Sequence, residues 1–239
     1  TTGILDSKFG FPIETGDATQ AIKSSIKASN LNLVGLHFHL GSPIFELEPY
    51  STAINAVLTF ASHFKNDGLD VQEFSPGGGF AIGYDITQPP PTIADYAQVI
   101  TSAVITGCND LGLNKPKLVV EPGRSIVGRA GVALYTVGTI KNIPGVRKYV
   151  SLDGGMGDNI RPALYQARYD AVIANKMSES LEETITLAGK FCESGDILVR
   201  DISLPHTTQG DIVAIPSSGA YAPSMANNYN MNPKPALIM

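Results

Sequence analysis

Three glycine-bearing motifs, each following an apolar run, most constrain how this chain of 239 residues can fold. The motifs are HFHLGS at 37–42, PGGGF at 76–80 and EPGR at 121–124. Ser42 and Gly79 are 37 residues apart, and Gly79 and Glu121 are 42 residues apart. This repeat predicts parallel βα units with functional residues at the carboxyl ends of the strands, as in a (β/α)₈ barrel.

Hydrophobic periodicity predicts the elements between these motifs. We expect strands at 31–38, 69–75 and 117–121, helices at 49–66 and 93–106, and a proline-rich loop at 88–92. The apolar residues at helical spacing in the first helix are Ala53, Val57, Phe60, Ala61 and Phe64. The first half of the chain is therefore predicted to be of the α/β class.

The second half of the chain has a different pattern. Short β-rich runs lie at 132–141, 147–153, 184–192 and 211–216, separated by glycine and proline. This pattern predicts an antiparallel β domain. We divide the chain into residues 1–129, part of a barrel, and residues 130–239, a β-rich domain. Three βα units cannot close a barrel of eight strands, so either the fold is not a barrel or the chain lacks the beginning of one.

Composition excludes several classes of protein. The net charge is −5 with no long run of one sign, which argues against nucleic acid and anionic membranes as partners. No apolar stretch reaches the ~18 residues that a membrane span needs. Cys108 and Cys192 lack metal-ligand spacing, so we expect no metal and a reducing, cytoplasmic setting. Charged residues make up only 16%, which suggests a surface buried against a partner.

Several side chains near the motifs suit chemistry on a phosphorylated ligand. Gly77, Gly78 and Gly79 would let backbone N–H groups approach an anion. Pro162 suits the first turn of a helix, in which four-residue spacing would put Arg161 and Tyr165 on one face. Each feature alone has a plainer explanation: a turn for the glycines and helix capping for the arginine.

Taken together, the motifs resemble those of the fold type III pyridoxal-phosphate decarboxylases, the family of ornithine, arginine and diaminopimelate decarboxylases. The motifs that complete the set are RPALY at 161–165, CESGD at 192–196 and GAY at 219–221. The resemblance runs from SKFG at 7–10 to NPKPA at 232–236. It implies that residues 1–128 are the back half of a cofactor-binding barrel and that the family's imine-forming lysine lies upstream of Thr1. The chain alone is then expected to lack decarboxylase activity.

The resemblance implies a pyridoxal 5'-phosphate site. His39 would stack on the cofactor ring, and Glu121 would keep the ring nitrogen protonated. Ser42, Gly79 and Tyr221 would hold the phosphate. The full set of cofactor-binding residues implied is His39, Ser42, Gly77, Gly78, Gly79, Glu121, Pro122, Gly123, Arg124 and Tyr221.

The resemblance also implies a substrate and an assembly. In the diaminopimelate branch of the family, the matching substrate-binding residues are Arg124, Arg161, Tyr165, Glu193 and Tyr221. Cys192 would return a proton from the other subunit of a homodimer with shared active sites; with His39 and Glu121 it completes the expected catalytic set. The reaction implied is decarboxylation of meso-2,6-diaminopimelate to L-lysine and carbon dioxide, a step of lysine biosynthesis.

Two alternatives remain open at this point. One is a sister decarboxylase acting on ornithine, arginine or carboxynorspermidine, against which Arg161 and CESGD speak. The other is a non-catalytic homologue that binds partners. Outside the motifs, we expect His37 to be structural and Cys108 to be a buried hydrophobic residue, and His63 and His206 have no clear role.

Overall fold

The computed structural model describes residues 5–84 and 87–239, which form two compact units. The first comprises Thr1–Ala81 and Pro90–Gly123, and the second comprises Ile82–Pro89 and Arg124–Met239. The division falls near the predicted boundary after residue 129 and adds the 82–89 segment to the second unit. Each unit is described by itself below.

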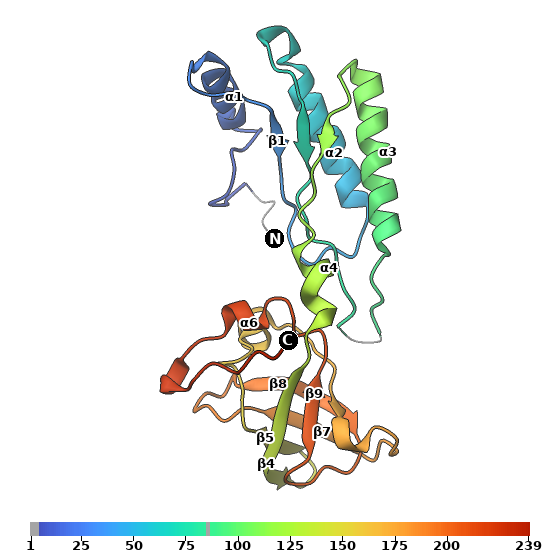
Figure 1. Ribbon diagram of the computed structural model, residues 1–239, viewed down its shortest axis with the longest axis vertical. Coiled ribbons are helices and arrows are strands. Elements are labelled where there is room, and N and C mark those ends of the chain that lie inside the picture. The colour runs from blue at the N-terminus through green and yellow to red at the C-terminus, as the bar shows by residue number, and fades with distance from the viewer. Residues whose placement is uncertain (1–4, 85–86) are drawn as a thin grey trace. The chain divides into compact units, whose positions relative to one another are not determined.

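The first unit alternates helices and short parallel strands (Figure 1). Its elements are α1 (Asp17–Lys27), β1 (Gly35–His37), α2 (Glu48–Ser62), the 3₁₀ turn η1 (Lys65–Asp67), β2 (Glu73–Ser75), α3 (Ile93–Leu111) and β3 (Lys117–Leu118). The strands form a parallel sheet in the order β1-β2-β3. The predicted βα alternation is confirmed, although the strands are shorter than expected and α1 was not predicted. The closed barrel of eight strands stays a prediction.

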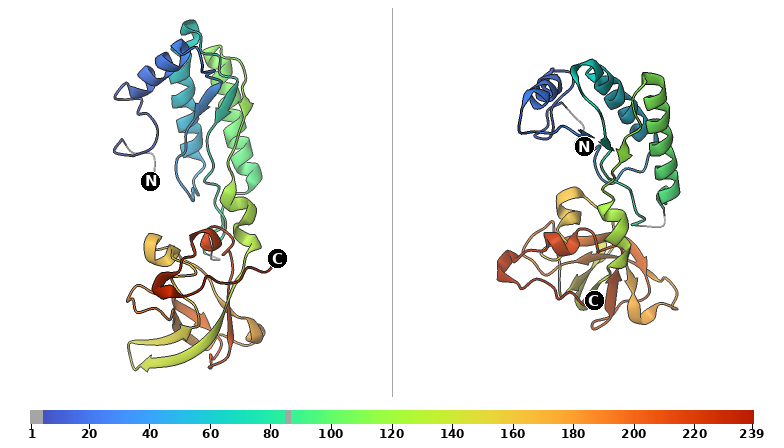
Figure 2. Two further views of the ribbon diagram at one scale, coloured as in Figure 1. Left: turned by 60° about the vertical axis from the view of Figure 1, so that its left-hand side comes forward. Right: turned by 45° about the horizontal axis from the view of Figure 1, so that its top comes forward.

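Helices α2 and α3 lie side by side along the sheet of the first unit (Figures 1 and 2). The buried stripe of α2 is Tyr50, Ile54, Leu58 and Ala61. Of the residues predicted from the sequence, Ala61 and Phe64 are confirmed as buried, and Val57 and Phe60 pack against the core from partly buried positions. The prediction missed the fully buried positions that lie one residue further along the first turns of the helix. Helix α3 begins at a capping box, in which Asp95 N–H donates to Thr92 Oγ1 at 3.1 Å.

The second unit is built on a sheet of six strands in the order β6-β9-β4-β5-β7-β8. Its elements are α4 (Gly123–Val127), η2 (Gly128–Ala130), β4 (Ala133–Ile143), β5 (Arg147–Leu152), α5 (Arg161–Tyr165), β6 (Val172–Ile173), η3 (Ala174–Lys176), β7 (Glu183–Ala188), β8 (Ile197–Leu204), β9 (Ile212–Ile215), α6 (Ala222–Met225) and η4 (Tyr229–Met231). Its core is packed from the inward faces of these strands, with Val150, Leu187 and Val213 fully enclosed.

The predicted all-antiparallel domain was wrong in one pairing, because β5 and β7 run parallel. A parallel pair needs a crossover connection of a dozen or more residues. The chain between Leu152 and Glu183 provides it, carrying α5, β6 and η3. The sheet is therefore mixed, and the crossover carries Arg161.

The predicted strand at 184–192 was wrong at its end, and β8 was not predicted. Strand β7 stops at Ala188, where Gly189 N–H donates to the Asp196 carbonyl oxygen at 2.9 Å. Lys190 N–H then donates to the Gly154 carbonyl oxygen. These bonds turn the chain out of the sheet, so Cys192 lies in a loop rather than a strand. Among the described residues, no helix combines the length and apolar character that a membrane crossing requires.

Candidate functional site

The carboxyl ends of β1, β2 and β3 bring together three of the predicted site segments. Gly78 pairs with Glu121 in a parallel bridge, and Glu121 N–H donates to the Gly77 carbonyl oxygen at 3.0 Å. The Gly78 N–H donates to His39 Nδ1 at 3.3 Å, which favours a proton on Nε2. The structure thus brings His39, Gly78 and Glu121 next to one another, as parallel strands predict.

Side chains cannot be accommodated in the glycine segment. Gly77 and Gly79 have φ angles of 75° and 92°, in the region that favours glycine. A Cβ on Gly77 would lie 2.7 Å from the Phe38 carbonyl oxygen, and one on Gly79 would overlap the Gly41 carbonyl oxygen. The segment is therefore a backbone cradle that only glycine can form.

Only one amide of the cradle remains available for an anion. Gly77 N–H donates to Ser75 Oγ at 3.3 Å, and Gly78 N–H is taken by His39. Gly79 N–H donates to no atom among residues 5–84 and 87–239. A donor on a side-chain-free turn fits the phosphate of a cofactor. The cofactor roles expected of Gly77 and Gly78 stay predictions. Because their amides are already bonded, these glycines would act by letting the cofactor approach the backbone closely.

Two buried tyrosines of the helix layer hold the cradle in place. Tyr50 of α2 donates to the Gly78 carbonyl oxygen at 2.7 Å. Tyr96 of α3 donates to the Ile44 carbonyl oxygen at 2.6 Å and accepts from Ala81 N–H at 3.1 Å. Burial raises the pKa of both phenols above their usual value, so both remain donors at neutral pH.

We expect Gly79→Ala to be far more damaging than an alanine at another left-handed glycine. Gly68 has a φ angle of 100° and open space around it, so Gly68→Ala should cost only the backbone strain of about 1–2 kcal/mol. Gly79→Ala adds the overlap with Gly41, roughly 1–3 kcal/mol more. Urea denaturation of both variants measures the difference. Equal losses of stability would show that the cradle adapts to a side chain.

The remaining predicted residues of the first unit lie in the loops that follow the strands. Ser42 is exposed in the loop after β1. Glu121 is also exposed, and Gly123 N–H donates back to its carbonyl oxygen at 2.9 Å, which closes a tight turn around the half-buried Pro122. An exposed carboxylate on a turn that is tied to the cradle can face a bound ligand.

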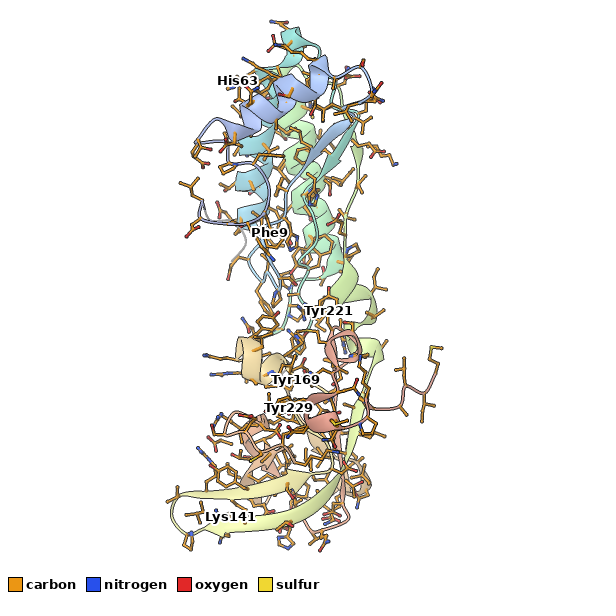
Figure 3. All side chains as sticks on the ribbon, turned by 90° about the vertical axis from the view of Figure 1, so that its left-hand side faces the viewer. Phe9, His63, Lys141, Tyr169, Tyr221 and Tyr229 are labelled. Carbon is orange, nitrogen blue, oxygen red and sulfur yellow. The ribbon has the colours of Figure 1, made fainter. Side chains whose placement is uncertain are left out.

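The second unit holds two buried arginines within a group of tyrosines. Arg124 and Arg161 are each 5% exposed. Arg161 Nη1 donates to the hydroxyls of Tyr84, at 3.2 Å, and Tyr169. Arg124 donates to the same Tyr84 hydroxyl, and its guanidinium lies 5.1 Å from the Tyr221 ring centroid. Tyr169 and Tyr221 are labelled in Figure 3. The predicted Arg124, Arg161 and Tyr221 thus belong to one cluster.

The predicted pairing of Arg161 with Tyr165 was wrong. Arg161 is buried, whereas Tyr165 is 61% exposed. Helix α5 is a single turn that ends at Tyr165, and the next residue, Gln166, has a φ of 54° that redirects the chain. The residue that contacts the guanidinium is Tyr169. Burial raises the pKa of Tyr169, and the positive charge of Arg161 partly offsets that rise. A substrate-binding role for Tyr165 stays a prediction, because Tyr165 does not share the buried face of Arg161.

Cys192 and Glu193 lie exposed on the loop after β7. Buried Asp196 organises this loop by accepting hydrogen bonds from Phe191 N–H at 2.8 Å and Met156 N–H at 2.6 Å. Tyr229 of η4 donates to the Glu193 carboxylate, and this bond raises the pKa of Tyr229. The loop therefore presents a thiol and an oriented carboxylate at the surface of the unit.

Sequence reasoning missed three tyrosines of these clusters: Tyr84, Tyr169 and Tyr229. None of them belongs to a motif quoted for the site, although each lies within eight residues of one. Cys108 is fully buried, as predicted. His37 Nδ1 lies 3.0 Å from Ser75 Oγ, and its structural role stays a prediction. In the part of the chain that the structure describes, no cluster of three or more histidine, cysteine or acidic residues could hold a metal.

The chain is similar in sequence to a known protein family and to several curated proteins. Residues 1–128 match the family model described as "Pyridoxal-dependent decarboxylase, pyridoxal binding domain". Diaminopimelate decarboxylase of Bacillus subtilis is 44% identical over 239 residues, which are 100% of this chain and 54% of that protein. That of Staphylococcus aureus is 45% identical over 99% of this chain and 56% of that protein.

Solved structures show the same likeness. Diaminopimelate decarboxylase from M. jannaschii, in co-complex with L-lysine, superposes with a TM-score of 0.91 at 37% identity. The match covers 98% of this chain and 53% of that one. The chain thus spans about half the length of the curated relatives that it matches.

Proposed function

The chain belongs to the pyridoxal-dependent decarboxylase family, and on that premise we propose that the protein containing it decarboxylates meso-2,6-diaminopimelate to L-lysine. The observation that carries the choice of substrate is the buried guanidinium of Arg161. Among residues 5–84 and 87–239 it forms no ion pair, and its side-chain hydrogen bonds go only to phenol oxygens. A buried cation without a counter-ion is costly, and a bound carboxylate would relieve that cost.

The residues at the strand ends fit a bound pyridoxal phosphate. The cofactor supplies an electron sink for the bond that breaks. The free amide of Gly79 would donate to its phosphate, together with the hydroxyls of Ser42 and Tyr221. His39 would lie against the ring, oriented by the Gly78 N–H on its Nδ1. The Glu121 carboxylate would hold a proton at the ring nitrogen.

The second unit supplies groups for the substrate. Arg124 and Arg161 would bind carboxylate, and the Glu193 carboxylate would meet the distal ammonium. Cys192 Sγ would deliver a proton to the carbon that has lost its carboxylate. Its exposure on a loop supports the proposal that it acts in the site of a partner subunit in a homodimer, since it needs to reach a ligand outside its own unit's core.

The two alternatives remain distinguishable. A decarboxylase for ornithine would have to leave Arg161 buried with no carboxylate to bind, since ornithine has only an ammonium at its far end. A non-catalytic homologue would have no use for an exposed thiol beside an oriented carboxylate. Both features therefore support the diaminopimelate reaction.

The experiment is an assay of the protein that contains this chain, supplied with pyridoxal phosphate and offered meso-diaminopimelate, ornithine or arginine. We expect carbon dioxide and L-lysine from meso-diaminopimelate, at a kcat/KM at least about 100-fold above that for ornithine. Faster turnover of ornithine would assign the protein to the sister branch. Cofactor binding without turnover of any of the three would support the non-catalytic alternative.

A further inference from the structure

Tyr84 is shared by the two buried arginines of the second unit. Its hydroxyl accepts from Nη1 of Arg161 and Nη1 of Arg124, and it donates to the Ala220 carbonyl oxygen at 3.3 Å. A phenol oxygen can accept two hydrogen bonds and donate one. These three bonds therefore use the full capacity of the hydroxyl, and no proton or lone pair remains for another group.

The ring of Tyr84 also contacts both cations. The Arg124 and Arg161 guanidinium carbons lie 5.6 Å and 5.3 Å from its centroid. Two buried cations on one side chain repel each other, and the π-face and neutral oxygen of a tyrosine reduce that repulsion. Without the hydroxyl, each guanidinium would lose the acceptor that sets its position relative to the other.

Tyr84 is itself held rigidly. Its carbonyl oxygen accepts from Asp170 N–H at 3.2 Å, and the preceding Gly83 carbonyl oxygen accepts from Ser217 Oγ at 2.9 Å. Its ring packs edge-on against Tyr169, with centroids 5.2 Å apart. A side chain fixed from three directions can impose its geometry on flexible arginines.

We propose that Tyr84 is a positioning residue that sets the spacing and orientation of the Arg124 and Arg161 guanidiniums as a carboxylate-binding pair. This inference rests on the proposed function, because the proposed function supplies the identity of the substrate. Tyr84 touches neither the substrate nor the cofactor in this role. It acts through the two arginines and determines selectivity for a ligand with a second carboxylate over one without it.

The test is Tyr84→Phe, which removes the hydroxyl and keeps the ring. We expect KM for meso-diaminopimelate to rise about 10-fold, with kcat within about twofold. Tyr169→Phe removes a hydroxyl that accepts from Arg161 and should raise KM less. The control is Tyr149→Phe, another tyrosine ring beside an arginine, at 5.8 Å from the Arg147 guanidinium, and it should leave KM unchanged.

A binding measurement keeps this test separate from that of the proposed function. Calorimetric affinity for pimelate, a diacid of the same carbon-chain length that cannot react, should fall about 10-fold in Tyr84→Phe. Affinity for hexanoate, which has one carboxylate, should change less than about twofold. Should Tyr84→Phe fail to fold, 3-fluorotyrosine at position 84 weakens the acceptor while keeping the hydroxyl. Unchanged pimelate affinity in the folded variant overturns the inference, even if meso-diaminopimelate is turned over.

Discussion

Replacing Arg161 by alanine is expected to raise KM for meso-diaminopimelate about 30- to 700-fold, the equivalent of roughly 2–4 kcal/mol. The physical reason is that the substrate carboxylate would lose a charge-assisted hydrogen bond in a place where water cannot replace it. The size of the effect follows from the burial of Arg161, which is only 5% exposed. Steady-state kinetics of the protein at saturating cofactor measure it.

The matched control is Arg168→Ala, seven residues further along the chain. Arg168 is exposed, so its removal subtracts the same charge from the same segment without touching the tyrosine cluster. Its KM should equal that of the unmodified protein. If Arg161→Ala instead keeps a normal KM and lowers the melting temperature, the guanidinium serves packing alone and the proposed substrate loses its main support.

The second large effect would come from the partner subunit of the proposed homodimer. Cys192→Ala and Glu121→Gln should each leave a homodimer nearly inactive, because every site would lack either its proton donor or the carboxylate on the ring nitrogen. If Cys192 acts in the site of the other subunit, a heterodimer of the two variants contains one site with both defects and one with neither. Random subunit exchange should therefore restore about a quarter of the unmodified activity.

The measurement is activity before and after mixing under conditions that exchange subunits, with heterodimers counted by a tag on one variant. The control mixture pairs Glu121→Gln with His39→Ala, two residues that the structure places on one cradle. That mixture should restore no activity. Because His39 and Glu121 of one site come from the same chain, each site of the heterodimer would still carry one defect. Failure of the first mixture, with heterodimers demonstrably present, would mean that Cys192 serves its own chain.

The cradle could be predicted from sequence because it follows from the pairing of parallel strands. Parallel strands of similar spacing end at one edge, so motifs that follow the strands must meet there, and His39, Gly78 and Glu121 do. The lengths of the strands did not follow in the same way. Strand β3 pairs only through Lys117 and Leu118, although the apolar run extends further.

The arginine cluster could be predicted only in part, because its partners depend on tertiary structure. Helical spacing pointed from Arg161 to Tyr165, but the left-handed residue Gln166 ends the helix and brings Tyr169 to the guanidinium instead. Tyr84 lies 77 residues from Arg161, so its proximity to PGGGF does not reveal that it contacts this guanidinium. Likewise, the parallel pairing of β5 and β7 depends on a long crossover that no periodicity reveals.

The hydrogen bonds of Tyr50 and Tyr96 raise the free energy needed to open the glycine segment locally. Loops that bind ligands are ordinarily among the first parts of a protein to open. Here Tyr50 donates to the Gly78 carbonyl oxygen, and Tyr96 accepts from the N–H of Ala81, which follows the segment. Opening the segment therefore means breaking hydrogen bonds to two side chains of the helix core. The hydrogen-bonded amides of Gly77 and Gly78 should therefore exchange with solvent more slowly than those of an ordinary ligand-binding loop. A phosphate would then meet a receptor that is already ordered, and little of the binding free energy would be spent on arranging it.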